Sequence, residues 1–285
     1  MKKITEMPKL KPRKPDAHKG NFGRVCIIGG SLGMSGAAAL SGRASLRSGA
    51  GLVRIATAKS VLPVIASIEP CCTTIPLAED GDGRIDAKAI DKILEITEDN
   101  DIIAFGPGIG ISSGLQTILQ KLIAKDIKLV VDADGLNNLA KIKNWHENKI
   151  AKMILTPHPG EMQRLWQGTF REQMPEDRQK TAGAYSQKTA CTLVLKGFES
   201  IVADGDKIYV NNTGNPGMAT GGSGDVLTGV ITALWGQGLS QFDAASLGTY
   251  IHGLAGDKAA EDKTQISMIA TDIIDFLGEA LKTLL

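Results

Sequence analysis

Short apolar runs rich in β-branched residues recur between residues 25 and 195, and runs of this kind are typical of buried strands. The predicted strands cover residues 25–28, 52–57, 102–105, 129–131, 153–155 and 193–195. Helical patterns lie between them, most clearly at 87–96 and 115–123. Because strands and helices alternate, the pattern predicts a mostly parallel sheet that is covered by helices on both faces.

The pattern changes after residue 200. Two short apolar runs, 201–203 and 208–210, flank the tight-turn sequence Asp204-Gly205-Asp206, so we predict a β-hairpin at the edge of the sheet. Helical patterns follow near 225–235, 241–261 and 269–284. No internal repeat, low-complexity tract or linker divides the sequence. We therefore expect a single α/β domain over residues 1–285, in which residues 1–20 form a basic, solvated lead-in.

Glycine, proline and aspartate cluster where most of the predicted strands end. The clusters are Gly29-Gly30-Ser31-Leu32-Gly33, Gly106-Pro107-Gly108-Ile109-Gly110, Asp132-Ala133-Asp134-Gly135, Thr156-Pro157-His158-Pro159-Gly160-Glu161 and Lys196-Gly197. Ligands of open α/β sheets bind beyond the carboxyl ends of the strands, so these loops predict one shared crevice. The first cluster lacks the spacing of a dinucleotide fingerprint, which argues against a dehydrogenase, and no Walker-type GxxxxGK[ST] sequence occurs.

The strongest signal is the glycine-rich segment 215–225, because a predicted helix follows it at once. Its glycines let backbone N–H groups crowd together at a helix N-terminus, where the free donors and the helix dipole favour an anion such as a phosphoryl group. Asp225 falls in the first turn, where the dipole favours the ionised carboxylate, and it can accept the proton of a substrate hydroxyl. The structural alternative is a helix cap after a tight turn.

Composition and charge narrow the class of protein further. Hydrophobic residues make up 42% and charged residues 22%, as in globular proteins, and the formal net charge of +1 argues against docking on nucleic acid or an anionic membrane. No apolar run has the length of a signal sequence or a membrane span. The four cysteines lack metal-ligand spacing, so we expect a cytoplasmic protein.

Motifs spread over nearly the whole sequence carry a family resemblance. They are His18-Lys19-Gly20, Gly29-Gly30-Ser31, Gly106-Pro107-Gly108, Leu155 to Glu161, Leu195-Lys196-Gly197 and Gly221-Gly222-Ser223-Gly224-Asp225. With them the chain resembles the ADP- or ATP-dependent NAD(P)H-hydrate dehydratases, the YjeF C-terminal-domain family of the ribokinase-like superfamily. The resemblance implies a three-layer α/β/α sandwich with a mostly parallel central sheet and an edge hairpin.

The resemblance also implies an activity. The family repairs NADH and NADPH to which water has added, and uses a nucleotide to remove the water again. Phosphoryl transfer to the ring hydroxyl turns a poor leaving group into phosphate, which explains a kinase-like site in a lyase. Mg²⁺ and ADP, or ATP in its place, are the implied cofactors, and ADP is adopted by analogy with relatives that stand alone.

By resemblance, particular residues take particular roles. Asp225 is the catalytic base, and the backbone N–H groups of Gly222, Ser223 and Gly224 hold the transferred phosphoryl. Nucleotide binding falls to Lys196, Gly197, Phe198, Glu199 and Ser200, together with Gly224; substrate binding falls to Ala37, Gly108, His158 and Asp225; and Glu161 organises Mg²⁺. Each has a structural alternative, such as a loop cap for His158 or a first-turn helix charge for Glu161.

Some points depart from the family or stay open. Ser223 replaces the threonine that is usual in this motif, which keeps a hydroxyl. Many relatives carry an N-terminal epimerase domain, so we expect the epimerase to be a separate protein here. Relatives form homo-oligomers, often tetramers. The alternative activities are a ribokinase-like kinase of vitamin precursors and a nucleotide sensor without catalysis, although Asp225 argues against the sensor.

Overall fold

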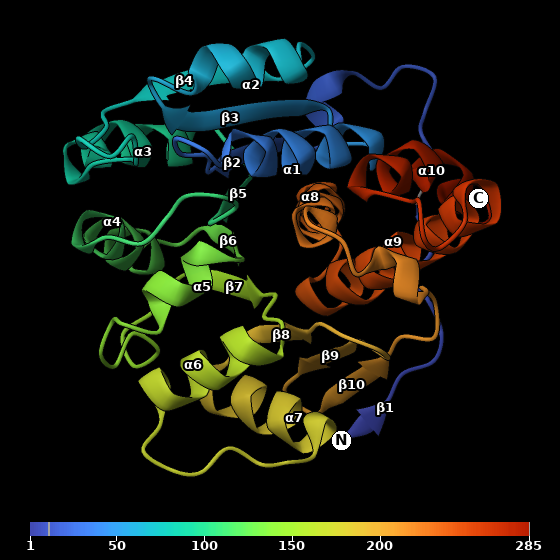
Figure 1. Cartoon of the computed structure of the whole chain (residues 1–285). Coiled ribbons are helices and arrows are strands. Elements are labelled where there is room, and N and C mark those ends of the chain that lie inside the picture. The colour runs from blue at the N-terminus through green and yellow to red at the C-terminus, as the bar shows by residue number, and fades with distance from the viewer. Residues whose placement is uncertain (11, 285) are drawn as a thin grey trace.

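The computed structural model describes residues 1–10 and 12–284. Its strands are β1 (Lys2–Lys3), β2 (Arg24–Ile28), β3 (Leu52–Ala58), β4 (Thr73–Leu77), β5 (Ile102–Phe105), β6 (Lys128–Val131), β7 (Lys152–Leu155), β8 (Thr192–Leu195), β9 (Ile201–Asp204) and β10 (Lys207–Val210). They form one ten-stranded sheet in the order β1-β10-β9-β8-β7-β6-β5-β2-β3-β4 (Figure 1). The run from β4 to β8 is parallel, and β9 is antiparallel to both of its neighbours.

Helices cover both faces of this sheet, as the alternating pattern predicts (Figure 1). One face carries α3 (Ile90–Glu98), α4 (Ser113–Ile123), α5 (Asp134–Leu139), α6 (Pro159–Thr169) and α7 (Arg178–Thr189). The other carries α1 (Ser35–Arg47), α2 (Leu62–Ile68), α8 (Ser223–Gly236), α9 (Gln241–Lys263) and α10 (Ala270–Lys282). Short 3₁₀ turns are η1 (Lys19–Phe22), η2 (Ala87–Ala89) and η3 (Pro216–Met218).

The central strands read as continuous apolar runs because both of their faces are buried. In β5, Ile102 and Ala104 pack under α8, while Ile103 and Phe105 pack under the helices of the opposite face. This alternation follows from the two-residue period of a strand. The sandwich expected from the sequence is therefore confirmed, and the predicted strands and helices from residue 25 onwards lie close to the expected ranges.

The sequence pattern missed the edge strand β4 and the helix α2 before it. In β4 only Leu77 is buried, and Pro76 interrupts the apolar run. An edge strand that packs on one side only has no need of a continuous apolar sequence. Its place beside β3 comes from parallel backbone pairing, which a periodicity argument does not detect.

Part of the N-terminal lead-in packs on the domain, while most of its side chains, its described basic residues included, are exposed. Lys2 and Lys3 form β1, which pairs parallel with β10 and covers the outer edge of the predicted hairpin. Further along the lead-in, Ile4 and Met7 are partly buried against the core under α9 and α10. The backbone groups of an unpaired sheet edge favour such a partner, and the charged side chains of β1 remain in solvent.

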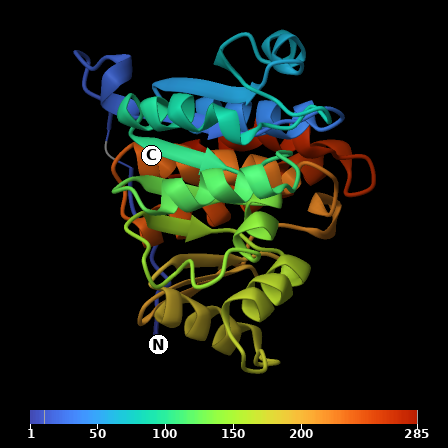
Figure 2. The ribbon, with the colours of Figure 1, turned by 90° about the vertical axis from the view of Figure 1, so that its left-hand side faces the viewer.

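The strands β2, β5, β6, β7 and β8 all run in the same direction, so their carboxyl ends lie along one edge of the sheet. Figure 2 looks onto the face with α3 to α7 and shows the strand arrows pointing to one side. The glycine-, proline- and aspartate-rich loops gather at that edge. None of the described helices is long and apolar enough to span a membrane.

Candidate active site

Asp132, at the end of β6, is the buried centre of the crevice. Its side chain is about 1% exposed. One carboxylate oxygen, Oδ1, accepts hydrogen bonds from Thr156 Oγ1 (2.7 Å) and Lys196 Nζ (2.8 Å). The other, Oδ2, accepts one from Thr228 Oγ1 in α8 at 2.6 Å. A buried carboxylate is stable only when it is paired and hydrogen-bonded in this way, so Asp132 ties three separate elements together.

Lys196 lies at the end of β8 and extends into the crevice rather than into solvent. Its ammonium contacts Asp132 and lies 3.9 Å from Glu161 Oε2. Burial lowers the pKa of Lys196, but the carboxylates of Asp132 and Glu161 outweigh it, and the net pKa is raised. A Cβ atom built on Gly224 would lie 3.2 Å from Nζ. The lysine is thus a fixed positive charge beside the first turn of α8.

The first turn of α8 has the geometry of an anion site. Gly222 is the N-cap, with φ of +91°, and no side chain caps the helix within the part of the chain that the structure describes. The positive φ favours glycine at this position, and a Cβ there would also displace Leu40 Cδ1, which lies 2.6 Å away. Ser223 N donates to Thr220 O at 3.4 Å, and the N–H groups of Gly224 and Asp225 in this first turn need external acceptors, which an anion supplies.

Asp225 sits in this turn and is partly buried. Burial first, and then the carboxylate of Asp132, raise the pKa of Asp225 to about 7, although Lys196 acts in the opposite direction. The expectation that the helix dipole keeps this carboxylate ionised is therefore incomplete, because through-space repulsion and desolvation outweigh the dipole. A pKa close to neutrality suits a group that must accept and release a proton.

His158 and Glu161 form the start of α6. His158 is its N-cap: Nδ1 accepts hydrogen bonds from Gly160 N (3.0 Å) and Glu161 N (3.4 Å), while Glu161 Oε2 accepts one from His158 N (2.8 Å). This is a capping box, so the structural alternatives for both residues are realised. The imidazole nevertheless stays half-exposed, with 51% of its side-chain surface open at the crevice.

The charge states of this pair differ from those of free side chains. Burial raises the pKa of Glu161, and burial followed by the charge of Lys196 lowers the pKa of His158. Since Nδ1 of the neutral imidazole accepts two hydrogen bonds, Nε2 carries the proton. Within residues 1–10 and 12–284, no three His, Cys, Asp or Glu side chains converge closely enough to hold a metal ion by themselves.

Ala37 and Gly108 are neighbours, as expected for two parts of one binding surface. Gly108 has φ of +60°, and a Cβ there would lie 2.9 Å from Ala37 Cβ and 2.5 Å from Met34 O. One turn further along α1, Ser41 Oγ donates to the carbonyl oxygen of Asp225 at 2.9 Å. The N-terminal half of α1 therefore links the loop after β5 to the turn that carries Asp225.

The loop 196–200 is a shaped turn at the rim of the crevice. Gly197 has φ of +138°, and Ser200 Oγ donates to Gly197 O at 2.9 Å and accepts from Gly197 N at 3.3 Å. Arg178, at the start of α7, donates to the carbonyl oxygen of Phe198 from the other side. The side chains of Phe198 and Glu199 are exposed, and Phe198 is 87% exposed. Lys196 is the residue of this loop that joins the buried charge cluster.

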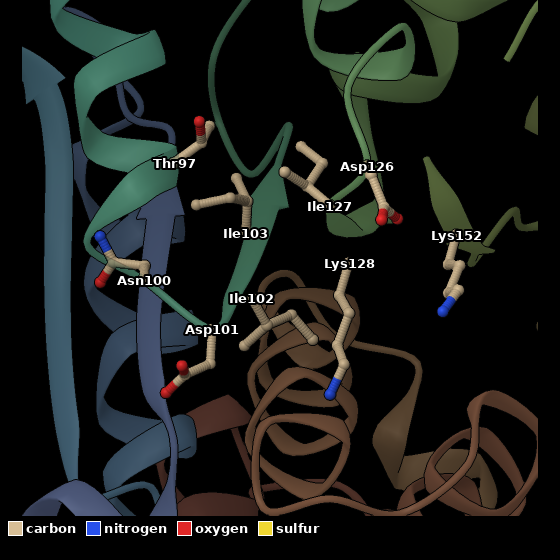
Figure 3. A pocket seen from close by; sticks show the side chains of 9 residues that line it. All are labelled: Thr97, Asn100, Asp101, Ile102, Ile103, Asp126, Ile127, Lys128 and Lys152. Atoms are coloured by element: carbon tan, nitrogen blue, oxygen red, sulfur yellow. The ribbon is translucent and has the colours of Figure 1, made fainter. Parts of the chain in front are cut away.

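A separate hollow of about 240 Å³ lies away from these loops, and Figure 3 shows its lining. Ile102, Lys128 and Lys152, which line it, are the first residues of β5, β6 and β7. It is therefore at the amino ends of the strands, opposite the crevice. The site residues of the crevice do not line it.

Sequence reasoning placed Asp132 and Thr156 in crevice loops but gave them no role, and it missed Thr228. Thr228 is fully buried on a helix that is otherwise mostly apolar. A hydroxyl in such a position needs a hydrogen-bond partner, which is the signal that could have identified it. Its partner could not be named without the fold, since Asp132 is 96 residues away along the chain.

The chain is similar to known proteins over most of its length. The family model described as NAD(P)H-hydrate dehydratase matches residues 25–278. The bifunctional NAD(P)H-hydrate repair enzyme Nnr of Moorella thermoacetica is 42% identical over 277 residues, covering 96% of this chain and 52% of that protein. The Escherichia coli enzyme of the same name is 39% identical, with 94% and 49% covered. The chain thus spans about half the length of these curated relatives.

Solved structures of other proteins have a similar fold. The ADP/ATP-dependent NAD(P)H-hydrate dehydratase of Bacillus subtilis, co-crystallised with ATP/Mg²⁺, superposes with a TM-score of 0.83 at 29% identity and covers 97% of this chain and 95% of that chain. Ribokinase of Arabidopsis thaliana, at 15% identity and a TM-score of 0.57, covers 91% of this chain and 99% of its own, and shares the fold.

Proposed function

The chain belongs to the NAD(P)H-hydrate dehydratase family, and from that premise we propose that it removes water from the S epimer of hydrated NADH or NADPH with ADP or ATP as phosphoryl donor. The hydroxyl oxygen on the nicotinamide ring attacks the terminal phosphorus, and the nucleotide leaves with one phosphate fewer. The ring C–O bond then breaks, phosphate departs with the electron pair, and loss of a proton from the adjacent ring carbon restores the double bond. The products are NADH or NADPH, phosphate and the shortened nucleotide.

The observation that carries this proposal is the position and charge of Asp225. It lies in the uncapped first turn of α8, and its pKa is raised to about 7. In the ionised form the carboxylate accepts the hydroxyl proton as the oxygen attacks, and it is basic enough to do so near neutral pH. A carboxylate with an ordinary pKa would be a weaker proton acceptor.

The groups around Asp225 stabilise the transferred phosphoryl. The N–H groups from Gly222 to Gly224 present partial positive charge at the helix N-terminus, and Lys196 adds a full charge beside Gly224. These donors are fixed before the reaction, since Asp132 holds the ammonium and Gly222 shapes the turn. Donors that need no reorganisation are the most effective at stabilising developing charge.

We assign the two sides of the crevice to the two ligands. Ala37, Gly108 and the half-exposed imidazole of His158 line the side proposed for the hydrated cofactor. The loop 196–200 and Gly224 form the side proposed for the nucleotide. Between them lies Asp225, where a hydroxyl from one side meets a phosphoryl from the other. Both assignments rest on the family resemblance together with this arrangement.

Mg²⁺ accompanies ATP in the Bacillus subtilis structure, and the acidic crevice here fits such an ion. Proteins usually hold Mg²⁺ through one or two carboxylates, with phosphates and water as the other ligands. Glu161, whose Oε2 accepts a hydrogen bond from His158 N at the edge of the crevice, is the residue that would hold such an ion. When bound, the ion would neutralise charge on the phosphates.

We also propose that residues 1–285 act as one catalytic domain in the cytoplasm and, from the family resemblance alone, that the protein forms a homotetramer. Light scattering of the purified protein measures the number of subunits directly. A monomer would overturn the assembly proposal and would leave the proposed chemistry intact.

The activity is tested with the purified protein, the S epimer of NADPH hydrate, Mg²⁺ and either ADP or ATP. We expect the absorbance of the restored dihydronicotinamide to return. The nucleotide that supports this recovery, ADP or ATP, is the phosphoryl donor. No recovery with either donor overturns the dehydratase assignment. If a phosphorylated product accumulates without NADPH, the protein is a kinase. Asp225→Asn should bind nucleotide without turnover, and the exposed Asp126→Asn should behave as the wild type.

A further inference from the structure

One face of α9 holds the segment that leads into α8. Gly253 and Gly256 lie one turn apart on this face. A Cβ on Gly253 would lie 2.2 Å from Thr213 Oγ1, and one on Gly256 would lie 2.3 Å from Met218 Sδ. The segment 213–218 therefore rests directly on the backbone of α9, which only glycine allows.

The next position of the same face adds polar contacts. The carboxylate of Asp257 accepts hydrogen bonds from Gly214 N (2.8 Å) and Asn215 Nδ2 (3.1 Å). Asn215 Nδ2 also donates to Gly256 O at 2.9 Å. Hydrogen bonds from the backbone of Gly214 and from the side chain of Asn215 thus hold the start of the glycine-rich segment on α9.

His252 extends this face to the first residue of α8. The side chain is buried, at 8% exposure, and Nε2 lies 3.0 Å from the carbonyl oxygen of Ser223. A carbonyl oxygen can only accept, so Nε2 must carry the proton. Burial lowers the pKa of His252 to about 4, so the imidazole is neutral at neutral pH. The imidazole of His252 therefore does more than pack in the core, because it donates one defined hydrogen bond to a backbone carbonyl.

The peptide that His252 contacts is the one that presents Gly224 N–H. The Ser223 carbonyl and the Gly224 N–H are opposite ends of one planar trans peptide, so fixing the carbonyl fixes the direction of the N–H. A hydrogen bond to the carbonyl also polarises the peptide and makes its N–H a stronger donor. The Gly224 backbone lies beside Lys196, on the side of the crevice where the phosphoryl group is transferred in the function proposed above.

We propose that His252 is a positioning residue for the reaction: by donating to Ser223 O, it aims and strengthens the Gly224 N–H that binds the transferred phosphoryl group. The inference rests on the proposed function. His252 touches neither ligand and acts through the Ser223 peptide. Gly253, Gly256 and Asp257 hold the preceding segment so that this contact can form.

The test compares His252→Leu, which removes the donor, with His252→Gln, whose Nε2 can still donate. Loss of a complete oxyanion-hole donor lowers kcat about 10²- to 10³-fold, so loss of its positioning residue should lower kcat roughly 10- to 100-fold. KM for ADP and for the hydrate should change less than about threefold, because the effect falls on the transition state. His252→Gln should recover most of kcat.

The control is Ile251→Ala, which removes a fully buried side chain next to His252 and is not placed in the site. It should lower the thermal midpoint at least as far as His252→Leu does, while kcat stays near the wild type. If kcat instead follows thermal stability across all three variants, or if folded His252→Leu keeps its full kcat, the inference is overturned. An inactive wild type would refute the proposed function, which is a different result.

A measurement on the wild type guards against variants that do not fold. In ¹⁵N-labelled protein at neutral pH, the ring of His252, identified by the signal lost in His252→Gln or by elimination among the four histidines, should carry its proton on Nε2. A proton on Nδ1 would leave no donor to Ser223 O. That result alone would overturn the inference.

Discussion

Replacing Asp225 by asparagine should abolish dehydration and at the same time stabilise the fold. The folded-state pKa of about 7 lies about 3 units above the ordinary value of 3.8, and each unit corresponds to about 1.4 kcal/mol. The native protein therefore binds this proton more tightly than the unfolded chain does. By linkage, stability falls as the pH rises from about 4 to about 7, and the whole penalty of about 4 kcal/mol is present above that range.

Asparagine cannot ionise, so Asp225→Asn does not lose stability as the pH rises. Its buried amide still needs hydrogen-bond partners, and we expect a net gain of about 1 to 3 kcal/mol near pH 8, which raises the thermal midpoint by roughly 2 to 6 °C. Near pH 4 the wild-type carboxyl is itself protonated, and the gain should vanish. Asp126→Asn, at an exposed position, is the control and should show little pH-dependent gain.

Calorimetry of both variants across this pH range measures the difference. The reasoning is refuted if Asp225→Asn is less stable than the wild type near pH 8, or if its gain does not depend on pH. The same pKa sets the activity of the wild type: kcat/KM of the free enzyme should rise with pH through about 7, as Asp225 loses its proton.

The other predictions concern the groups around Asp225. Lys196→Met should lower the free energy of unfolding by about 3 to 5 kcal/mol in urea titrations, because it leaves the buried Asp132 unpaired, and adding Asp132→Asn should restore part of that loss. Gly224→Ala should leave the thermal midpoint nearly unchanged but lower kcat about 10- to 1000-fold, because its Cβ would lie 3.2 Å from Lys196 Nζ. Calorimetric titration should show ADP binding at least tenfold more tightly with Mg²⁺ than with EDTA, and equal affinities would contradict the acidic character of the crevice.

The strands that are buried on both faces of the sheet could be predicted from the sequence. Strands such as β5 are covered on both faces, so their apolar runs stand out against the polar loops. The pattern gave no sign of β4 or β1, since one is an edge strand interrupted by Pro76 and the other consists of two exposed lysines. Both owe their place to backbone pairing, and side-chain periodicity carries no information about that.

The candidate site also has a part that the sequence could predict and a part that it could not. The first turn of α8 could be predicted because its signal is local: glycines followed at once by a helix. The charge state of Asp225 could not, because Asp132 and Lys196, which set it together with burial, come from loops far away in sequence. Lys196 is a further example. Its position after a strand was visible, but its pairing with Asp132 depends on the crossing of distant elements.

The balance of charges in the crevice gives a reason why, in the proposed reaction, backbone groups and a single lysine would hold the phosphoryl. The carboxylates of Asp132, Asp134 and Glu161 all contribute to the raised pKa of Asp225, and Lys196 opposes them. A second lysine would bind phosphate more strongly, but it would also lower the pKa of Asp225 and weaken the base. Helix N–H groups avoid this conflict, since they offer only partial charge and aim it at the phosphoryl oxygens. The glycine-rich turn and the acidic loops are therefore one solution to a single requirement, a strong base beside an anion site.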